Sequence, residues 1–223
     1  FSKWDPDDRE KYIGTAEQWE EAQGAMKRIL DHLEIPYVDG IGEAAFYGPK
    51  LDIQIRNVHG KEDTLITLQI DQMLAEKFGM EYVDADGIKK NPYIIHRTSI
   101  GCYERTLALL LEKYAGALPL WLMPTQVKVL PIGERHHEYA KALGEKLSAA
   151  GIRVEVDDRN EKIGYKIREA QLEKIPYMLV CGDKETEASE VSVRHRSKGD
   201  LGAMGIDAFL DLACREIREK TID

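Results

Sequence analysis

The chain has 223 residues, of which 43% are hydrophobic and 32% are charged, and its formal net charge is -9 at pH 7. This composition predicts a folded protein of one or two domains and argues against disorder. No run approaches the roughly 18 consecutive apolar residues of a membrane helix, and the acidic balance argues against binding nucleic acid by charge alone.

The cysteines indicate the cellular compartment of the protein, and the first residues indicate whether the chain is part of a longer one. Cys102, Cys181 and Cys214 are far apart, odd in number and without C-x-x-C spacing, which argues against disulfides and against a cysteine-based zinc site. A reducing cytoplasm fits this usage. Because the chain opens at Phe1 without an initiator methionine, we expect it to be a truncation of a longer protein.

The first predicted element is a helix over residues 16–33. Thr15 followed by Gln18 forms a capping box at its start. Its apolar residues recur at three- and four-residue spacing and predict a core-facing stripe. The stripe consists of Trp19, Ala22, Met26, Ile29, Leu30 and Leu33.

Two segments then alternate strictly between apolar and polar residues and predict an antiparallel strand pair. They span residues 51–56 and 66–71, with a turn near His59 and Gly60 between them. One face is apolar, and the other carries Asp52, Gln54, Arg56, Thr67, Gln69 and Asp71. The alternation alone favours solvent at the polar face over a binding site.

A third strand is predicted over residues 93–97, followed by a helix that begins near Glu104. Residues 107–111 are apolar nearly all round, which predicts a helix buried on most sides. Burying Arg105 at the start of this helix would be costly without an anion beside it. Arg105 is therefore expected to pair with a protein carboxylate or with the phosphate of a ligand.

The stretch 114–124 contains Gly116, Pro119 and Pro124 and predicts a boundary between domains 1–120 and 121–223. Net charge is -7 before Pro124 and -2 from there on, so the second half is the better candidate for a nucleic-acid partner. Alternating strands and helices beyond the boundary predict an α/β domain with a largely parallel sheet. The strands are expected at 126–132, 152–156, 177–181 and 191–194, and the helices at 135–150, 164–174 and 206–220.

Five segments resemble one protein family, in the family's order. Residues 43–52 resemble the threonyl-tRNA synthetase segment that closes over the amino acid, and residues 95–97 and 101–105 resemble the third class II synthetase motif. Residues 158–169 and 175–185 resemble the anticodon-binding domain. The similarity runs from Ile13 to about Arg218, and matches of this length in one order are highly specific.

This resemblance implies an α+β unit followed by an α/β unit. The first would be part of a class II catalytic domain, in which ATP with magnesium and threonine bind on an antiparallel sheet. The second would be an anticodon-binding domain with a mixed, largely parallel sheet. The implied partners are threonine tRNA, ATP and threonine. The family dimerises largely through its first motif, which has no counterpart here, so dimerisation is left open.

The resemblance also assigns roles on the predicted polar face. Tyr47 and Lys50 would contact substrate, and Thr67 and Gln69 would point toward the adenylate. Arg105 would bind ATP phosphate, and Arg105 and Lys50 are the candidate catalytic residues. Cys102 would also border the nucleotide.

His96 corresponds to one of three zinc ligands in the family, where zinc binds the amine and hydroxyl of threonine and so rejects isosteric valine. The other two zinc ligands and the first two class II motifs have no counterpart in this sequence. A single imidazole cannot make a four-coordinate zinc site. We therefore expect this chain alone neither to hold zinc nor to form threonyl-adenylate.

Two positions depart from the family pattern. Thr64-Leu65-Ile66 stands where the family usually has Gln-Cys-Gly, and Cys102 stands where serine is common. The first departure removes an amide from the adenylate site. Both are compatible with a subfamily with altered nucleotide contacts or with a variant of lower activity.

In the second domain the resemblance implies that Asn160, Lys162, Glu185 and Arg194 read anticodon bases, whose edges are exposed in a single-stranded loop. Without the resemblance, a surface salt-bridge cluster would be the preferred interpretation. The nearby Asp157-Asp158 pair is interpreted as a solvated acidic turn rather than a metal site.

Two alternatives stay open at the level of sequence. One is a binding module without catalysis that grips tRNA or a partner protein. The other is a synthetase for proline, glycine or histidine, although His96 and residues 46–50 favour threonine.

Overall fold

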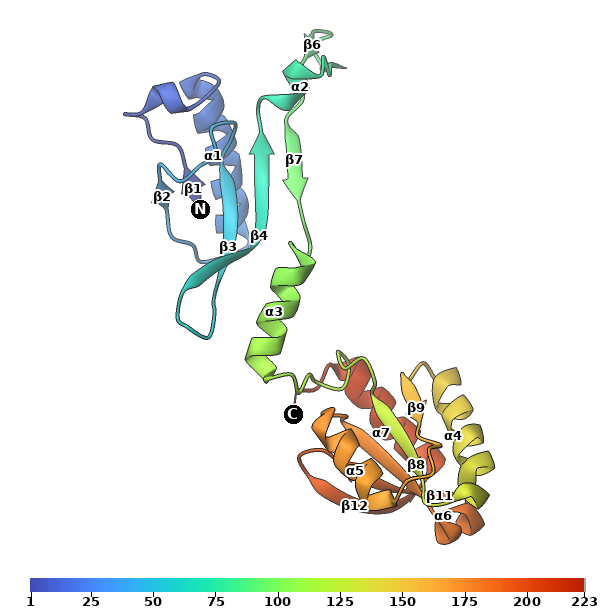
Figure 1. Cartoon of the computed structure of the whole chain (residues 1–223). Helices are drawn as coiled ribbons and strands as arrows, with labels where there is room; N and C mark the ends of the chain where they lie inside the picture. Colours follow the sequence, from blue (N-terminus) through green and yellow to red (C-terminus); the bar gives the residue numbers. More distant parts are fainter. Residues whose placement is uncertain (223) are drawn as a thin grey trace. The chain divides into compact units, whose positions relative to one another are not determined.

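The computed structural model describes residues 1–222, and contacts divide the chain into two compact units. The first unit is Phe1–Leu109 and the second begins at Leu110. Figure 1 shows the course of the chain through both. No helix within residues 1–222 is long and apolar enough to cross a membrane.

The first unit is built on a five-stranded sheet with the strand order β2-β1-β3-β4-β7. Strands β1 and β2 pair in parallel, and the other neighbours pair antiparallel. The helical elements are η1 (Arg9–Lys11), α1 (Ala16–His32) and α2 (Leu74–Lys77), and strands β5 (Tyr82–Val83) and β6 (Lys89–Lys90) form a separate hairpin. The sheet strands are β1 (Ser2–Lys3), β2 (Gly40–Ile41), β3 (Lys50–Arg56), β4 (Glu62–Asp71) and β7 (Ile94–Arg97).

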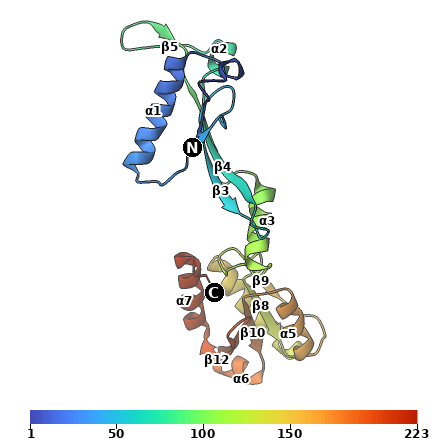
Figure 2. The ribbon, with the colours of Figure 1, turned by 90° about the vertical axis from the view of Figure 1, so that its left-hand side faces the viewer.

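Helix α1 covers one face of this sheet (Figure 2). The predicted capping box is confirmed, because Thr15 and Gln18 exchange hydrogen bonds at the helix start. Four residues of the predicted stripe are buried, but Ile29 and Leu33 are 59% and 58% exposed. The stripe prediction is therefore wrong at Ile29 and Leu33.

The two faces of the central strands differ in an unexpected way. On the apolar face Ile53 is 45% exposed, whereas on the polar face Gln69 is 8% exposed and Asp71 is fully buried. The preference for solvent at the polar face is therefore wrong at these two residues. Their burial makes this face a candidate binding surface.

Helix α3 (Tyr103–Tyr114) begins as predicted but has no buried residue, and Leu107 and Leu111 are 52% and 46% exposed. The prediction of a helix buried on most sides is wrong. Only its last turn, through Leu110 and Tyr114, packs on a core cluster of the second unit. The division between the contact units falls within this helix.

The second unit has a five-stranded mixed sheet with the order β12-β11-β10-β8-β9. Strand β8 pairs in parallel with β9 and β10, while β10-β11 and β11-β12 are antiparallel. The strands are β8 (Val127–Pro131), β9 (Val154–Val156), β10 (Tyr177–Cys181), β11 (Glu190–His195) and β12 (Gly199–Gly205). The helical elements are η2 (Glu134–His136), α4 (His137–Ala149), α5 (Ile163–Leu172), α6 (Asp183–Ala188) and α7 (Ile206–Glu219). The predicted α/β unit with a mixed sheet is thereby confirmed, and two of the four strand pairings are parallel.

Helices cover both faces of this second sheet. Leu143 of α4 and Phe209 of α7 pack with Val129 on one face. Ala170 of α5 packs with Leu130 and Met178 on the other. All six of these apolar side chains are at most 2% exposed, so the sheet forms a closed three-layer core.

The Gly- and Pro-rich stretch before β8 is bound tightly to the second unit. Arg153 donates hydrogen bonds to the carbonyl oxygens of Trp121, Met123 and Pro124 at 2.8–3.2 Å. Arg196 binds the Leu118 carbonyl at 2.7 Å, and Lys174 binds that of Ala115. Three cationic side chains thus fix the backbone of this stretch, so it is not a flexible linker.

Candidate functional site

The candidate site of the first unit is a row of three polar residues across the sheet. Strand register places Lys50 of β3 opposite Gln69 of β4, and Gln69 opposite His96 of β7. Paired residues on neighbouring strands project from the same face. Gln69 and His96 line a hollow of about 310 Å³ together with Thr67, Cys102 and Arg105. The structure therefore brings most of the predicted nucleotide site together.

Tyr47 reaches the same row from the loop before β3. Its hydroxyl donates a hydrogen bond to Oε1 of Gln69 at 3.1 Å. Tyr47 lines an adjoining hollow of about 240 Å³, which shares His96 with the first. Within residues 1–222 the Gln69 Nε2 atom is buried without a hydrogen-bond partner. A buried donor in this state is unfavourable unless a ligand or water satisfies it.

Sequence reasoning assigned no role to Asp52, yet this carboxylate organises the edge of the site. It accepts hydrogen bonds from Thr67 at 2.7 Å and Ser2 at 3.1 Å, and it pairs with Lys50 at 2.7 Å. Burial alone would raise the pKa of Asp52, but these partners outweigh it and lower the pKa overall. Lys50 and Thr67 are thus held by one ionised group. The strict strand alternation was the only sequence signal for it.

Arg105 lies at the start of α3 and is held close to the sheet. Its Nη1 donates to the Thr64 carbonyl oxygen at 2.5 Å. The turn before α3 requires Gly101, whose φ is +77° and whose Cβ, if present, would lie 2.0 Å from the Leu65 carbonyl oxygen. Arg105 is exposed, and within residues 1–222 this bond is to a neutral group. Its positive charge therefore stays available to an anion.

The first departure from the family pattern lies at a β-bulge beside this hollow. Ile53 pairs with Ile66 and Gln54 with Thr64, so Leu65 is the extra residue of β4. The Thr64 hydroxyl donates to Gln54 at 3.1 Å, and the Cys102 thiol donates to Glu104 at 3.0 Å. Both altered positions line the hollow that contains Arg105.

His96 does not form a zinc site with the described residues. Its Nε2 contacts Oδ2 of Asp71 at 2.9 Å, and residues 1–222 contain no group of three potential metal ligands. Burial would raise the pKa of Asp71, but hydrogen bonds from His96 and from backbone N–H groups outweigh it and lower the pKa. One imidazole and one engaged carboxylate do not fit the ligand number of zinc in proteins.

In the second unit, two of the predicted base-reading residues share one loop. Asn160 and Lys162 lie between β9 and α5, where Lys162 is the N-cap residue of the helix, and both are exposed. Glu185 lies in α6, and its carboxylate accepts from the Gly182 N–H at 3.0 Å. Arg194 of β11 pairs with Asp200 at 3.1 Å. Arg194 pairs with Met178 near the start of β10, whereas α6, which carries Glu185, follows the end of β10. Arg194 and Glu185 therefore lie toward opposite ends of this strand.

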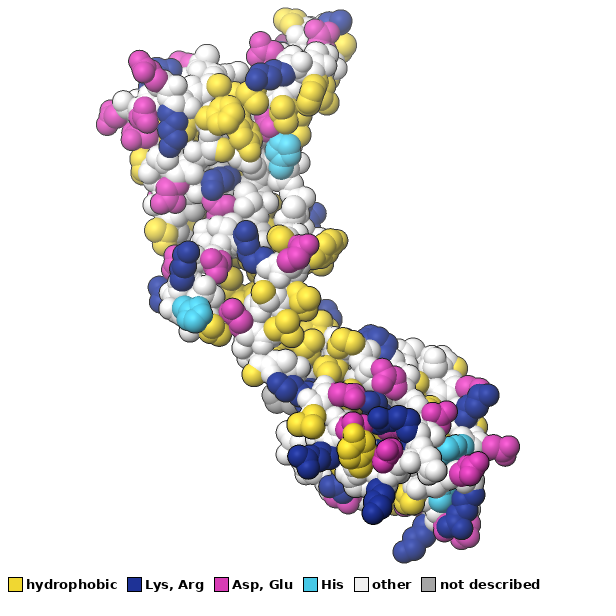
Figure 3. All heavy atoms as spheres, in the orientation of Figure 1, with side chains coloured by type: hydrophobic (Ala, Val, Ile, Leu, Met, Phe, Trp, Pro, Cys, Tyr) yellow, Lys and Arg dark blue, Asp and Glu magenta, His cyan; other side chains and the backbone are white. Residues whose placement is uncertain are grey.

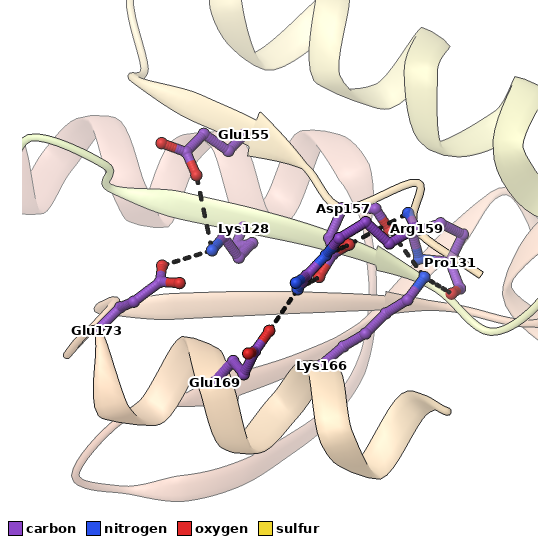
Figure 4. Close-up of polar contacts among 8 residues, drawn as sticks. All are labelled: Lys128, Pro131, Glu155, Asp157, Arg159, Lys166, Glu169 and Glu173. Carbon is purple, nitrogen blue, oxygen red and sulfur yellow. Dashed lines mark hydrogen bonds and ion pairs between the residues drawn. The ribbon is translucent and has the colours of Figure 1, made fainter. Parts of the chain in front are cut away.

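The loop before α5 rests on a charged network that the sequence did not reveal (Figure 4). Asp157 is 6% exposed and accepts two side-chain hydrogen bonds from Arg159, at 2.8 and 2.7 Å. The bonds from Arg159 lower the pKa of Asp157, against an opposing effect of burial. The prediction of a solvated acidic turn is therefore wrong for Asp157. Asp158 is exposed as expected.

Figure 3 shows how charged side chains are distributed on one face of the second unit. On the face shown, its Lys and Arg side chains are intermingled with Asp and Glu. No large patch of Lys and Arg alone is visible on that face. This charge distribution does not favour binding of a polyanion through bulk charge.

Two known families match the chain, one for each of its two structural units. Residues 5–114 match the family described as the tRNA synthetase class II core domain (G, H, P, S and T), and residues 126–216 match the anticodon binding domain. The chain belongs to the class II aminoacyl-tRNA synthetases.

Within this class the sequence matches the threonine–tRNA ligases. It is 60% identical to the threonine–tRNA ligase of Clostridium botulinum over 99% of the chain and 34% of that protein. It is 52% identical to that of Halalkalibacterium halodurans over 96% of the chain and 34% of the relative. The chain thus spans about a third of the length of these curated relatives.

Solved structures agree with this assignment. The RNA binding domain of threonyl-tRNA synthetase from Cryptosporidium parvum superposes with a TM-score of 0.83 at 35% identity, covering 96% of this chain and 53% of the other. A putative threonyl-tRNA synthetase from Aeropyrum pernix gives a TM-score of 0.72 at 28% identity, covering 98% and 53%.

Proposed function

We propose that the chain serves an ATP-dependent threonine–tRNA ligase, with nucleotide and threonine binding on the first unit and anticodon binding by the second. The observation that carries the first half is the hollow in which the unpartnered Nε2 of Gln69 and the exposed Arg105 come together. A donor and a cation at one hollow suit a phosphorylated adenylate. The proposed domain boundary at residues 120–121 lies inside the segment 115–125 that neither family match covers, whereas contacts begin the second unit at Leu110.

The roles follow from the positions of the side chains. Arg105 would stabilise the negative charge of the ATP phosphates during displacement, and Lys50, oriented by Asp52, would do so from the neighbouring strand. Gln69, oriented by Tyr47, would donate its free N–H to the bound substrate. Thr67 and Cys102 would line the nucleotide. These groups position and stabilise reactants rather than transfer protons.

For catalysis by this chain alone the expectation is negative. The described residues contain no three-ligand metal group, and the first two class II motifs of the family have no counterpart in the sequence. We expect no ATP–pyrophosphate exchange above background from the 223-residue chain with threonine. Measurable exchange would contradict this expectation.

RNA binding tests the second half of the proposal. We expect Arg194→Ala to weaken binding of a threonine anticodon stem-loop by about 1–3 kcal/mol, because a base contact is lost. Fluorescence anisotropy with a labelled stem-loop measures this loss. Arg215→Ala is the matched control, since Arg215 is an exposed residue of α7.

The outcome also separates the alternative functions. A non-catalytic module that binds only a protein would show no preference for the threonine stem-loop over a proline stem-loop. Unchanged affinity of Arg194→Ala for the threonine stem-loop would refute the assigned role of Arg194.

A further inference from the structure

A buried lysine beneath the loop before α5 has no role in the function proposed so far. Lys166 lies in α5 and is 1% exposed. Its Nζ donates to the carbonyl oxygens of Pro131 at 3.1 Å and of Asp157 at 2.8 Å. Pro131 ends β8 and Asp157 directly follows β9, so one ammonium group ties the ends of two parallel strands to the helix (Figure 4).

Burial of this charge is unfavourable for folding by itself. Removing an ammonium group from water costs several kcal/mol, and buried ion pairs are often replaced by apolar residues without loss of stability. The neighbouring cluster offsets the charge, because the two cations Lys166 and Arg159 are accompanied by the two carboxylates of Asp157 and Glu169. A lysine at this site is better explained by what it holds in place than by the stability of the core.

What it holds is the loop 157–162. At its beginning, Lys166 binds the Asp157 carbonyl, and the Asp157 N–H donates to Val129 at 2.9 Å. In its middle, Arg159 is tied to Glu169, which lies three residues after Lys166 on α5. At its end, the Lys162 carbonyl accepts the first helical hydrogen bonds of α5. The loop is therefore anchored to α5 on both sides of Asn160.

We propose that Lys166 is a positioning residue for RNA recognition, which fixes the loop 157–162 so that Asn160 and Lys162 meet anticodon bases without further ordering. This inference rests on the proposed function of the second unit. Binding is tighter when the contacting segment is already in its bound conformation, because less conformational entropy is lost. Arg159 supports the same loop from its exposed side.

The test is Lys166→Met, which keeps the apolar stem and removes the ammonium group. We expect affinity for the threonine anticodon stem-loop to fall about tenfold, the size of one lost base contact. Affinity for a stem-loop with altered anticodon bases should change less than about twofold. Lys141→Met is the matched control, because Lys141 is an exposed residue of α4 on the opposite face of the sheet.

Salt dependence separates positioning from direct contact. Lys166 is buried and meets no phosphate, so the slope of log Kd against log salt should stay that of the wild type. A reduced slope in Lys166→Met would overturn the proposal, because it would mean that Lys166 itself binds the RNA.

A double-mutant cycle with Asn160→Ala gives the decisive readout. If Lys166 acts through the loop, adding Lys166→Met to Asn160→Ala should lower affinity by less than about threefold. Full additivity would overturn the inference, as would an equal loss of affinity for both stem-loops. Should Lys166→Met fail to fold by circular dichroism, Arg159→Gln removes the exposed half of the anchor, and the same loss of discrimination is expected.

Failure of the inference is distinguishable from failure of the proposed function. If the wild-type chain does not prefer the threonine stem-loop, the proposed function fails. If the wild type shows the preference and Lys166→Met keeps both the affinity and the preference, only the role of Lys166 fails.

Discussion

The candidate sites of the two units satisfy their polar groups in opposite ways. In the first unit the Nε2 of Gln69 is buried without a partner within residues 1–222, and Arg105 keeps its charge exposed. In the second unit the polar groups of Lys166, Asp157 and Arg159 are all bound by other groups of the protein beneath a loop. The first arrangement leaves interactions for a small ligand to complete. The second uses its interactions internally, so that a recognition loop has one conformation.

The two sheets also differ in how completely their faces are covered. Helices cover both faces of the second sheet, whereas on the first sheet even apolar Ile53 is 45% exposed. Stability should therefore be concentrated in the second unit. Three measurements sharpen or break this comparison.

The largest expected effect is on the core of the second unit. Leu130→Ala removes a fully buried side chain between β8 and α5 and should destabilise the unit by about 2–5 kcal/mol. Ile53→Ala should cost less than about 1 kcal/mol, because the side chain is already half in water. Urea unfolding followed by circular dichroism measures both. Equal losses would break the comparison.

An intermediate effect is expected from the charged network, and it should depend on pH. The folded-state pKa of Asp157 is lowered by Arg159, so its contribution is complete above the unfolded pKa of about 4 and is lost as pH falls through the folded value. Asp157→Asn should therefore destabilise the unit by about 1–2 kcal/mol at pH 7.

The pH profile supplies the control for Asp157. The difference in unfolding free energy between wild type and Asp157→Asn should shrink as the pH is lowered from 5 toward 2. A difference that stays constant over this range would show that Asp157→Asn destabilises the unit because the amide fits poorly, and not because the carboxylate charge is lost.

The smallest expected effect is on the unpartnered amide of the first unit. Gln69→Leu removes a buried donor that no described residue satisfies and should change stability by less than about 1 kcal/mol, in either direction. The same change should weaken nucleotide binding. Thermal unfolding and calorimetric titration with ATP measure the two effects. A large loss of stability would show that Gln69 serves the fold.

Sequence periodicity predicted the elements whose own residues determine them. The capping box at Thr15, the alternating strands and β10 all appear where expected. Strand β12 was missed, because its glycines at 199, 202 and 205 give no alternation, and its place depends on pairing with β11. The burial of helix α3 was predicted wrongly, because a pattern that is apolar all round does not show whether other elements cover the helix.

The site could be predicted only in part, for a similar reason. Resemblance supplied Tyr47, Gln69 and Arg105, and the structure places them at adjoining hollows. Asp52 and Lys166 were missed, because a carboxylate in an alternating strand and a lysine in a helix both look like surface residues. Their roles depend on partners distant in sequence, such as Ser2 and Pro131.

The stretch 115–124, whose carbonyl oxygens Arg153, Lys174 and Arg196 hold, has a consequence for engineering this chain. Such a stretch does not behave as a flexible spacer, whose length could be varied at a small entropic change. Inserting or deleting a residue there would shift carbonyl groups away from the cations that bind them. Fusions or truncations of the second unit should therefore start upstream of Ala115, so that the stretch 115–124 is kept whole.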